Sequence, residues 1–268
     1  MDEHLKSDLW ETANALADAA RAAILPYFRG DALETANKDA GGYDPVTVAD
    51  RAAEQAMRDI LAKHRPDDAI LGEEYGADPG SSGLTWVLDP IDGTRAFVAG
   101  THTWGVLIAL SDESGPLLGV IDQPYVGERF CGGLGRASMS GPLGTRPLRS
   151  RETQTLSEAI LFTTFPEVGT PEDRTAFEAV ANQAQLTRYG MDCYAYALVA
   201  AGQIDLVIEA GLAAYDIQAP IAVIEAAGGI VTDWSGGPVH EGGRVLAAAN
   251  RDIHAAALAT IQATLSDG

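Results

Sequence analysis

The first part of the chain carries apolar residues at intervals of three and four, the spacing of one face of a helix. They are Leu5, Leu9, Ala13, Leu16, Ala20, Ala23, Ile24 and Tyr27. The pattern predicts a long amphipathic helix that ends near Arg29-Gly30. A second amphipathic pattern covers residues 52–61 and predicts a helix with Thr47 and Asp50 at its start.

Short apolar runs in the middle of the chain predict strands over residues 69–72, 86–88, 104–110, 117–122 and 128–131. Pro90 cannot donate to a strand ladder, so we expect the strand at 86–88 to stop before it. Strands that follow one another without helices favour an antiparallel sheet. Residues 138–151 contain glycine and proline and predict a loop, which we interpret as the boundary between two halves, 1–145 and 146–268.

Beyond this boundary, predicted strands and helices alternate. The strands cover residues 159–164, 186–189, 206–209, 230–232 and 245–249, and the helices 172–184, 193–201, 217–227 and 253–265. Pro220 should fall in the first turn of its helix, where a missing N–H is tolerated. Alternation of this kind indicates an α/β layered half. The chain as a whole is therefore predicted to be α+β followed by α/β, with ligands bound between the halves.

Composition narrows the function. The 268 residues suffice for a sizeable core, and 18 Lys and Arg against 38 Asp and Glu give a net charge of −20. This charge argues against nucleic acid as a partner, because a phosphate backbone needs a basic surface. The cysteines Cys131 and Cys193 form no disulfide framework. No apolar run reaches membrane-spanning length, so we expect no membrane partner and a cytoplasmic protein.

Candidate chemistry gathers after the strand at 86–88. Asp89 and Asp92 lie three residues apart on a predicted tight turn, with Gly93 and Thr94 directly behind them. Mg²⁺ prefers oxygen ligands, and two carboxylates on one turn can share such ions. The alternative is a polar turn whose Asp side chains bond their own backbone. Further acidic positions weaken that alternative, namely Asp50, Glu73, Glu74 and Asp216.

Four motifs in order carry a resemblance. They are the segments DPVTVAD at 44–50, LGEE at 71–74, DPIDGT at 89–94, and YD at 215–216 followed by EAAGG at 225–229. From about residue 38 to 233 the chain resembles the inositol monophosphatase-like family of metal-dependent phosphatases. The resemblance implies a layered αβαβα fold, with an antiparallel sheet in the N-terminal half and a mixed sheet in the C-terminal half. It also implies a homodimer that hydrolyses a phosphate monoester with two or three Mg²⁺, for which Mn²⁺ can substitute.

The resemblance also assigns metal ligands. Glu73, Asp89 and the backbone carbonyl of Ile91 would hold one ion, and Asp89, Asp92 and Asp216 a second, while Glu73 with waters would hold a weaker third. Asp216 precedes the helix predicted at 217–227 and would also suit its N-cap. Both roles are compatible, because one carboxylate oxygen can cap while the other ligates.

Catalytic roles follow in the same way. Asp50 and Thr94 would orient the attacking water and take its proton, although an Asp at the start of a helix also suits a plain cap. Glu74 would position water, because adjacent strand residues point to opposite faces and Glu73 and Glu74 cannot serve one ion alike. The amides of Gly93 and Thr94 would hold phosphate oxygens. The loop at 38–43, including Lys38, can bear on a metal site in this family.

The residues that would choose the substrate lie further along. Segments 190–198, 205–212 and 214–216, with Arg95 after the metal turn, resemble the histidinol-phosphate phosphatase branch of the family. Histidinol phosphate is cationic at its non-reacting end, so Asp192 and Glu209 would be its anionic partners, while Arg95 would contact phosphate or pair with a carboxylate. Alternatively, Asp192 caps the helix at 193–201 and Glu209 is an exposed strand end. Rival functions are an inositol-1-monophosphatase, a broad-specificity sugar or polyol phosphatase, and a non-catalytic regulatory binding protein.

Overall fold

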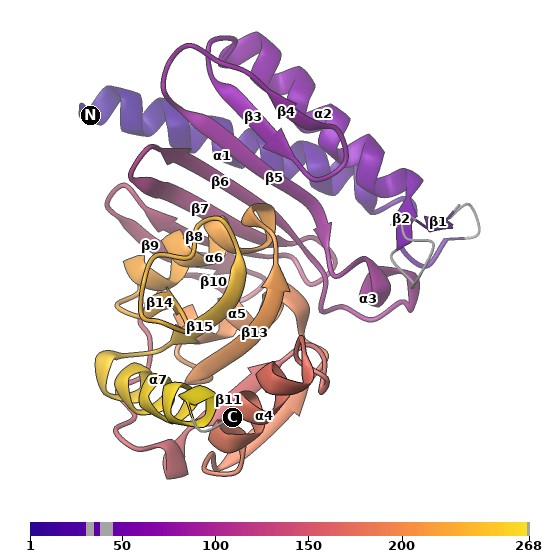
Figure 1. Cartoon of the computed structure of the whole chain (residues 1–268). Coiled ribbons are helices and arrows are strands. Elements are labelled where there is room, and N and C mark those ends of the chain that lie inside the picture. Colours follow the sequence, from indigo (N-terminus) through magenta and orange to yellow (C-terminus); the bar gives the residue numbers. More distant parts are fainter. Residues whose placement is uncertain (31–34, 38–44, 267–268) are drawn as a thin grey trace.

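The computed structural model describes residues 1–30, 35–37 and 45–266, and within that part of the chain it forms five layers (Figure 1). Helices α1 (Glu3–Ile24) and α2 (Val48–His64) cover the outer face of a large sheet. Helices α5 (Asp192–Ala200) and α6 (Ala214–Ala226) lie between that sheet and a smaller one. Helices α4 (Pro171–Ala181) and α7 (Arg251–Ser266) form the opposite outer layer. The predicted αβαβα layering is confirmed.

The large sheet has the strand order β10-β9-β8-β7-β6-β5-β3-β4. Its strands are β3 (Ala69–Gly72), β4 (Gly76–Asp78), β5 (Thr85–Asp92), β6 (Gly105–Asp112), β7 (Gly115–Gln123), β8 (Glu128–Gly133), β9 (Arg136–Gly141) and β10 (Gly144–Pro147). Neighbouring strands are antiparallel, as predicted, except that β3 and β5 run parallel. The parallel pair follows from the connection through β4, which returns the chain to the same end of the sheet.

The predicted loop at 138–151 is wrong over most of its length. Strands β9 and β10 pair there as an antiparallel hairpin, with Gly144 at a φ of 96° just after the turn. Strand β10 is the edge strand and is exposed throughout, while β9 beside it buries only Met139, so neither strand shows apolar alternation. A hairpin of this kind leaves no hydrophobic signal in the sequence.

The smaller sheet has the order β12-β11-β13-β15-β14. Its strands are β11 (Ile160–Thr163), β12 (Leu186–Tyr189), β13 (Leu206–Leu212), β14 (Ile230–Asp233) and β15 (Gly243–Ala248), and a short 3₁₀ turn, η1 (Leu156–Glu158), precedes them. Strand β11 is parallel to β12 and to β13, whereas β15 is antiparallel to β13 and to β14. The predicted mixed sheet is confirmed.

Two helix boundaries differ from the prediction because of proline. Helix α1 ends at Ile24, earlier than expected, because Pro26 follows and has no N–H to continue the helical bonds. Helix α6 begins at Ala214, so Pro220 lies inside the helix rather than in its first turn. A proline there leaves the Asp216 carbonyl without its usual helical donor.

A small antiparallel hairpin of β1 (Thr35–Asn37) and β2 (Pro45–Thr47) leads into α2. The predicted 38–43 loop with Lys38 lies outside the described residues. Three apolar cores hold the layers together: one under α1 and α2, one between the sheets, and one under α4 and α7. Cys193 belongs to the middle core, and neither it nor Cys131 forms a disulfide.

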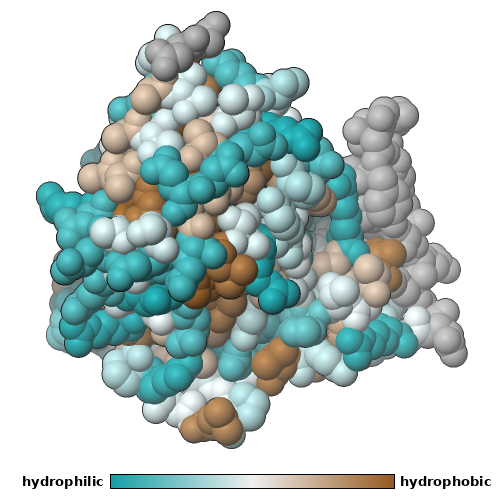
Figure 2. Space-filling view, turned by 90° about the horizontal axis from the view of Figure 1, so that it is seen from below, coloured by the Kyte–Doolittle hydropathy of each residue, from teal (hydrophilic) through white to brown (hydrophobic). Residues whose placement is uncertain are grey.

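The surface is mostly hydrophilic on the face seen from below, with only separate apolar patches (Figure 2). Among the described residues, no helix combines the length and the apolar character that a bilayer crossing requires. The strands β5 and β13 and the start of α6 approach one another between the two sheets, and this is where the acidic motifs meet (Figure 1).

Candidate active site

Strand β5 carries the first two acidic residues on a bulge. Asp89 pairs with Leu107 of β6 and Asp92 with Gly105, so β5 fits one extra residue between them. The expectation that the strand stops before Pro90 is wrong, because the missing N–H of a proline is tolerated at a bulge. The bulge turns the side chains of Asp89 and Asp92 toward the same pocket.

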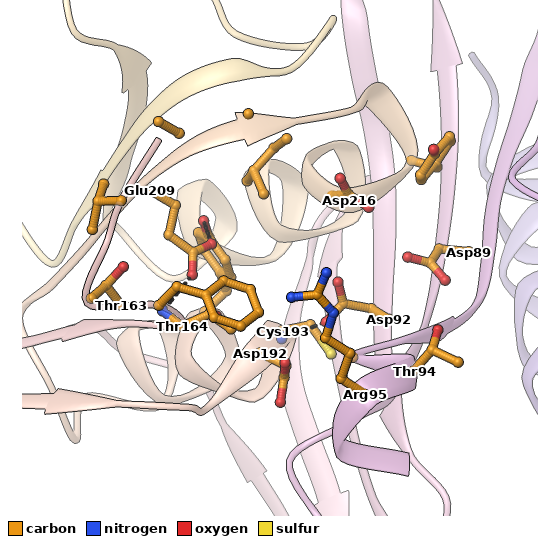
Figure 3. A pocket seen from close by; sticks show the side chains of 18 of the residues that line it. Asp89, Asp92, Thr94, Arg95, Thr163, Thr164, Asp192, Cys193, Glu209 and Asp216 are labelled. Atoms are coloured by element: carbon orange, nitrogen blue, oxygen red, sulfur yellow. Dashed lines mark hydrogen bonds between the residues drawn. The ribbon is translucent and has the colours of Figure 1, made fainter. Parts of the chain in front are cut away.

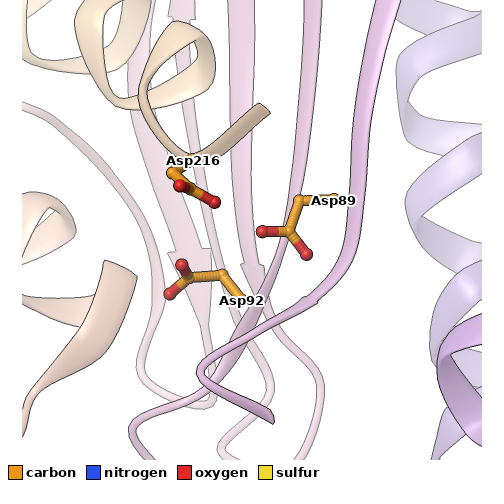
Figure 4. A group of neighbouring side chains, drawn as sticks. All are labelled: Asp89, Asp92 and Asp216. Atoms are coloured by element: carbon orange, nitrogen blue, oxygen red, sulfur yellow. The ribbon is translucent and has the colours of Figure 1, made fainter. Parts of the chain in front are cut away.

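Helix α6 supplies the third carboxylate. One oxygen from each of Asp89, Asp92 and Asp216 lies within 4.8 Å of the others, and we call these residues the acidic cluster (Figure 4). The sequence suggested Asp216 as the N-cap of α6, but the N-cap residue is Ala213. Asp216 lies three residues after Ala213 and accepts the Ala213 N–H at 2.7 Å through Oδ2. It therefore stabilises the helix start from the first turn.

The acidic cluster is arranged for a cation. Burial, followed by the charges of Glu73, Asp92 and Asp216, raises the pKa of Asp89 well above its usual value. Burial and the neighbouring Asp192 raise the pKa of Asp92 likewise, and burial raises that of Asp216 to about 6. Within the described part of the chain, Asp89 Oδ1 is buried without a hydrogen-bond partner. Buried carboxylates require a counter-charge, and oxygen-only donors suit a hard divalent cation.

Asp50 and Thr94 form a pair beside the acidic cluster. The Thr94 hydroxyl lies 3.4 Å from Asp50 Oδ1 and 3.1 Å from the carbonyl oxygen of Ile91. Asp50 is not the N-cap of α2, because Thr47 occupies that position and donates its backbone N–H to Asp50 Oδ2. Burial raises the pKa of Asp50 to about 6, with a further contribution from the charge of Glu74. The carboxylate thus caps the helix with one oxygen and faces Thr94 with the other.

Glu73 and Glu74 lie in the turn between β3 and β4. Glu73 lines the pocket, whereas the side chain of Glu74, which is 2% exposed, lies 3.9 Å from Arg51. The two carboxylates therefore lie in different surroundings, as expected. A turn, rather than the alternation of side chains along a strand, separates them. The sequence also allows an exposed acidic strand end, more plausibly at Glu74 than at Glu73, and a Glu74 side chain buried to this degree does not fit that alternative.

The pocket has a volume of about 610 Å³ and lies between the two sheets (Figure 3). The C-terminal half lines the pocket with residues 163–169, 192–196 and 209–212, which we call the far wall, and this wall meets the end of β5 where the Cys193 N–H donates to Asp92 at 2.6 Å. Arg95, from the short helix α3 (Thr94–Val98), points into this space and its guanidinium lies 5.1 Å from the ring centre of Phe165. No ion pair of Arg95 with a carboxylate occurs among the described residues.

Asp192 and Glu209 are both held in the far wall. Asp192 Oδ2 accepts the Thr103 hydroxyl at 2.6 Å, and the residue has an unusual φ of 47°. It does not cap α5, because the Cys193 N–H at the start of that helix bonds to Asp92 Oδ2 at 2.6 Å. A Cβ on Gly93 would lie 2.8 Å from the Asp192 carboxyl carbon, so glycine is needed there.

Glu209 is buried, not an exposed strand end. Its Oε1 accepts the Thr164 N–H at 2.9 Å and its Oε2 accepts the Tyr196 hydroxyl at 2.7 Å. Burial raises the pKa of Glu209, and these two hydrogen bonds work against that rise. Sequence reasoning missed Thr103 and Thr164, because they lie 89 and 45 residues from the carboxylates that they hold. Tyr196 lies inside the predicted segment 190–198, but no pattern assigned it to Glu209.

The layered fold and the acidic cluster define a class, the phosphatases that work with divalent cations. A sequence profile described as the inositol monophosphatase family matches residues 5–266, and the chain belongs to that family. Members are metal-dependent, and this chain is a phosphoric monoester hydrolase.

Relatives with different names support this assignment. The "Bifunctional phosphatase IMPL2, chloroplastic" of Arabidopsis thaliana is 42% identical over 93% of this chain and 73% of its own length. A histidinol-phosphatase of Mycobacterium tuberculosis is 34% identical over 87% of this chain and 91% of its own. The solved structure of an inositol monophosphatase from Zymomonas mobilis superposes with a TM-score of 0.84 at 37% identity, covering 98% of this chain and 100% of that one.

Proposed function

We propose that the protein is a Mg²⁺-dependent histidinol-phosphate phosphatase, which converts L-histidinol phosphate and water to L-histidinol and phosphate in histidine biosynthesis. The observation that carries the proposal is the charge of the pocket. Among the described residues that line it, seven are acidic and one, Arg95, is basic, a formal charge of −6. The seven are Glu73, Asp89, Asp92, Glu167, Asp192, Glu209 and Asp216.

Two divalent cations at the acidic cluster and Glu73 would leave the pocket at −2, and the phosphate monoester adds further negative charge. A leaving group that carries an amine and an imidazole would offset this excess, whereas a neutral polyol would not. Asp192 and Glu209 face the part of the pocket away from Asp89, where the leaving group would lie (Figure 3). Each keeps a carboxylate lone pair for an N–H or O–H of the substrate.

The residues suited to the metal ions are those that the resemblance implies. Glu73, Asp89 and the Ile91 carbonyl would hold one Mg²⁺, Asp89, Asp92 and Asp216 a second, and Glu73 with waters a weaker third. The bound ions would neutralise the phosphate oxygens and make a bound water more acidic. Mn²⁺, with similar oxygen preferences, would substitute.

The chain itself would move the proton. The Thr94 hydroxyl donates toward Asp50 Oδ1, so its oxygen is available to accept from the attacking water. Asp50 then takes the proton, which its raised pKa favours because a base works best near the operating pH. Arg95 would contact a phosphate oxygen, and the amides of Gly93 and Thr94 would do the same. Glu74 would act on this water only indirectly, through its charge beside Asp50.

A second candidate is an inositol-1-monophosphatase or a broad-specificity sugar phosphatase. The 37% identity to the Zymomonas mobilis inositol monophosphatase over nearly the whole chain favours it. The chemistry at the metal ions would be the same, and Asp192 and Glu209 would accept hydroxyl hydrogens instead of charged N–H groups. The substrate is therefore the only difference between the two proposals.

Phosphate release distinguishes these candidates. L-Histidinol phosphate and inositol 1-phosphate are compared at matched concentrations with Mg²⁺, and again with a chelator. We expect kcat/KM to favour histidinol phosphate by at least about tenfold, and the chelator to abolish both reactions. Equal rates or a preference for inositol phosphate would reject the proposed substrate and leave the hydrolase assignment unchanged. The homodimer stays a prediction, which size-exclusion chromatography checks.

A further inference from the structure

We infer that Glu54 and Arg58 of α2 form a positioning pair, which fixes the turn that carries Glu73 and Glu74. Neither residue lines the active-site pocket. The inference rests on the metal role proposed for Glu73 and assigns its placement to a second set of residues.

Glu54 binds the amide side of the turn. It is fully buried at the end of β3, where its Oε2 accepts the Glu74 N–H at 2.6 Å and its Oε1 accepts the Tyr75 N–H at 3.2 Å. Hydrogen bonds from two successive amides to one carboxylate fix the orientation of the peptide groups between them. The backbone directly after Glu73 is therefore tied to α2.

Arg58 binds the carbonyl side of the same turn. Its Nε donates to Glu54 Oε1 at 2.8 Å, and its terminal nitrogens donate to the Gly76 carbonyl at 2.5 Å and to Asp78 Oδ2 at 2.7 Å. The guanidinium also neutralises the buried Glu54 carboxylate, which would otherwise be costly to bury. Both ends of the turn are thus held by residues one helical turn apart.

The end of β3 is shaped to admit this carboxylate. A Cβ on Gly72 would lie 2.0 Å from Glu54 Oε1, so only glycine leaves room for the carboxylate beside the strand. The position has no positive φ that would call for glycine on conformational grounds. Close approach of Glu54 is therefore what requires glycine at this position.

The pair fixes the position of Glu73 relative to Asp50. Asp50 lies one helical turn before Glu54 on α2, so the same rigid element carries the proposed proton acceptor and holds the turn of Glu73 and Glu74. If the turn were loose, Glu73 would lose its fixed position in the pocket. Partners that orient a metal ligand typically change metal affinity by about 10- to 100-fold when removed.

The test uses Glu54→Gln in the full-length protein. Glutamine keeps the size, but its amide nitrogen cannot accept, so at least one N–H donor loses its partner: Glu74 if the nitrogen replaces Oε2, or Tyr75 and Arg58 if it replaces Oε1. We expect Mg²⁺ binding, measured by calorimetry without substrate, to weaken about tenfold. The Mg²⁺ concentration for half-maximal phosphate release should rise equally, while KM for the phosphate ester at saturating Mg²⁺ stays within about twofold.

Asp68→Asn is the matched control. Asp68 is also a buried carboxylate; it pairs with Arg65 at 2.7 Å, accepts from Trp86 at 3.0 Å, and lies at the opposite end of β3. This variant should lose comparable thermal stability without any change in Mg²⁺ binding. Equal Mg²⁺ binding by wild type and Glu54→Gln would overturn the inference alone, whereas a wild type that binds no Mg²⁺ would overturn the proposed metal site and the inference together.

A measurement on the wild type covers the case in which Glu54→Gln does not fold. The amides of Glu74 and Tyr75 should exchange with solvent as slowly as those inside α2, although they lie in a turn. Rapid exchange of both amides would overturn the inference. Arg58→Lys, which keeps the charge but cannot bind Glu54, Gly76 and Asp78 together, should weaken Mg²⁺ binding in the same direction; unchanged binding would count against the pair.

Discussion

The acidic cluster and the far wall line one pocket and meet at Asp92 and Cys193, but the carboxylates of Asp89 and Glu209 are in opposite states. In the acidic cluster, Asp89 Oδ1 is buried without a hydrogen-bond partner among the described residues. In the far wall, both oxygens of Glu209 accept hydrogen bonds, from Thr164 and from Tyr196. The first region is suited to a cation from outside the chain, while Glu209 in the second already accepts hydrogen bonds from the chain's own donors. Substitutions on the two sides should therefore differ in kind.

The largest effect is expected from Asp89→Asn. Removal of a carboxylate shared by both proposed ions should reduce phosphate release by about 10³-fold or more. The metal-free variant should nevertheless melt at or above the wild-type temperature, because a neutral amide removes a buried charge that is repelled by its neighbours. Thermal melting with and without Mg²⁺ measures this, and the gain in Tm on adding Mg²⁺ should disappear.

Asp122→Asn provides the contrast for this prediction. Asp122 is equally buried, but Arg21 and Arg129 pair with it at 2.9 and 2.7 Å. Its loss should lower the Tm by several degrees and leave the gain on adding Mg²⁺ intact. An Asp89→Asn protein that kept a tenth of its activity would contradict the metal assignment.

A somewhat smaller loss should follow Asp50→Asn. Removing the proton acceptor should lower kcat by about 10²- to 10³-fold with little change in Mg²⁺ binding. In the wild type, kcat/KM should fall tenfold per pH unit below pH 6, because Asp50, whose pKa is about 6, must be ionised to accept the proton. Thr94→Val should give a loss of the same order, and a flat pH profile in the wild type would contradict the role of Asp50.

On the far wall, Asp192→Asn should change substrate choice rather than turnover. Asparagine tolerates the positive φ at this position and can still accept from Thr103, so the fold should be unaffected. Loss of one charged hydrogen bond should raise KM for histidinol phosphate about tenfold and leave KM for inositol 1-phosphate within twofold. Equal changes for both substrates would show that Asp192 does not recognise the cationic end.

The same contrast explains what could be predicted from sequence. Asp89, Asp92 and Thr94 lie within six residues, so their spacing predicts a shared turn, and the further acidic residues Asp50, Glu73, Glu74 and Asp216 favour a metal site there over a plain polar turn. The partners of the far-wall carboxylates come from other segments: Thr103 bonds to Asp192, which lies 89 residues further along the chain, and Thr164 bonds to Glu209, which lies 45 residues further along. Such pairs depend on how the layers pack, which no local pattern encodes.

The predicted fold was wrong where tertiary structure overrides a rule that considers only residues near in sequence. Pro90 was expected to end its strand, but the bulge in β5 accommodates it. The hairpin of β9 and β10 does not show in the sequence, because β10 is exposed throughout and β9 buries only Met139. Asp50 and Asp216 stabilise the starts of their helices from inside the first turn rather than as N-caps. The N-cap residues, Thr47 and Ala213, lie three residues earlier.

The smallest predicted effect is a dependence of metal-free stability on pH. The folded pKa values of Asp50 and Asp216 are about 6, above the ordinary 3.8. Both carboxyl groups therefore bind a proton more tightly in the folded protein than in the unfolded chain. The stabilisation of the folded state that results is fully present below about pH 3.8 and is lost as the pH rises through 6. Without metal, the Tm should therefore be a few degrees higher at pH 5 than at pH 7.5.

Saturating Mg²⁺ should reverse the sign of this difference, because the ion binds the ionised carboxylates and stabilises the folded state most where they are deprotonated. Asp216→Asn is the control, since an amide does not titrate and the metal-free difference should shrink. The far-wall variant Asp192→Asn should keep the reversal by Mg²⁺, because Asp192 is not one of the three carboxylates of the acidic cluster, although its charge contributes to the raised pKa of Asp92. A metal-free Tm that rises from pH 5 to pH 7.5 would mean that the charges of the acidic cluster do not oppose folding, and the contrast between the two sides of the pocket would fail.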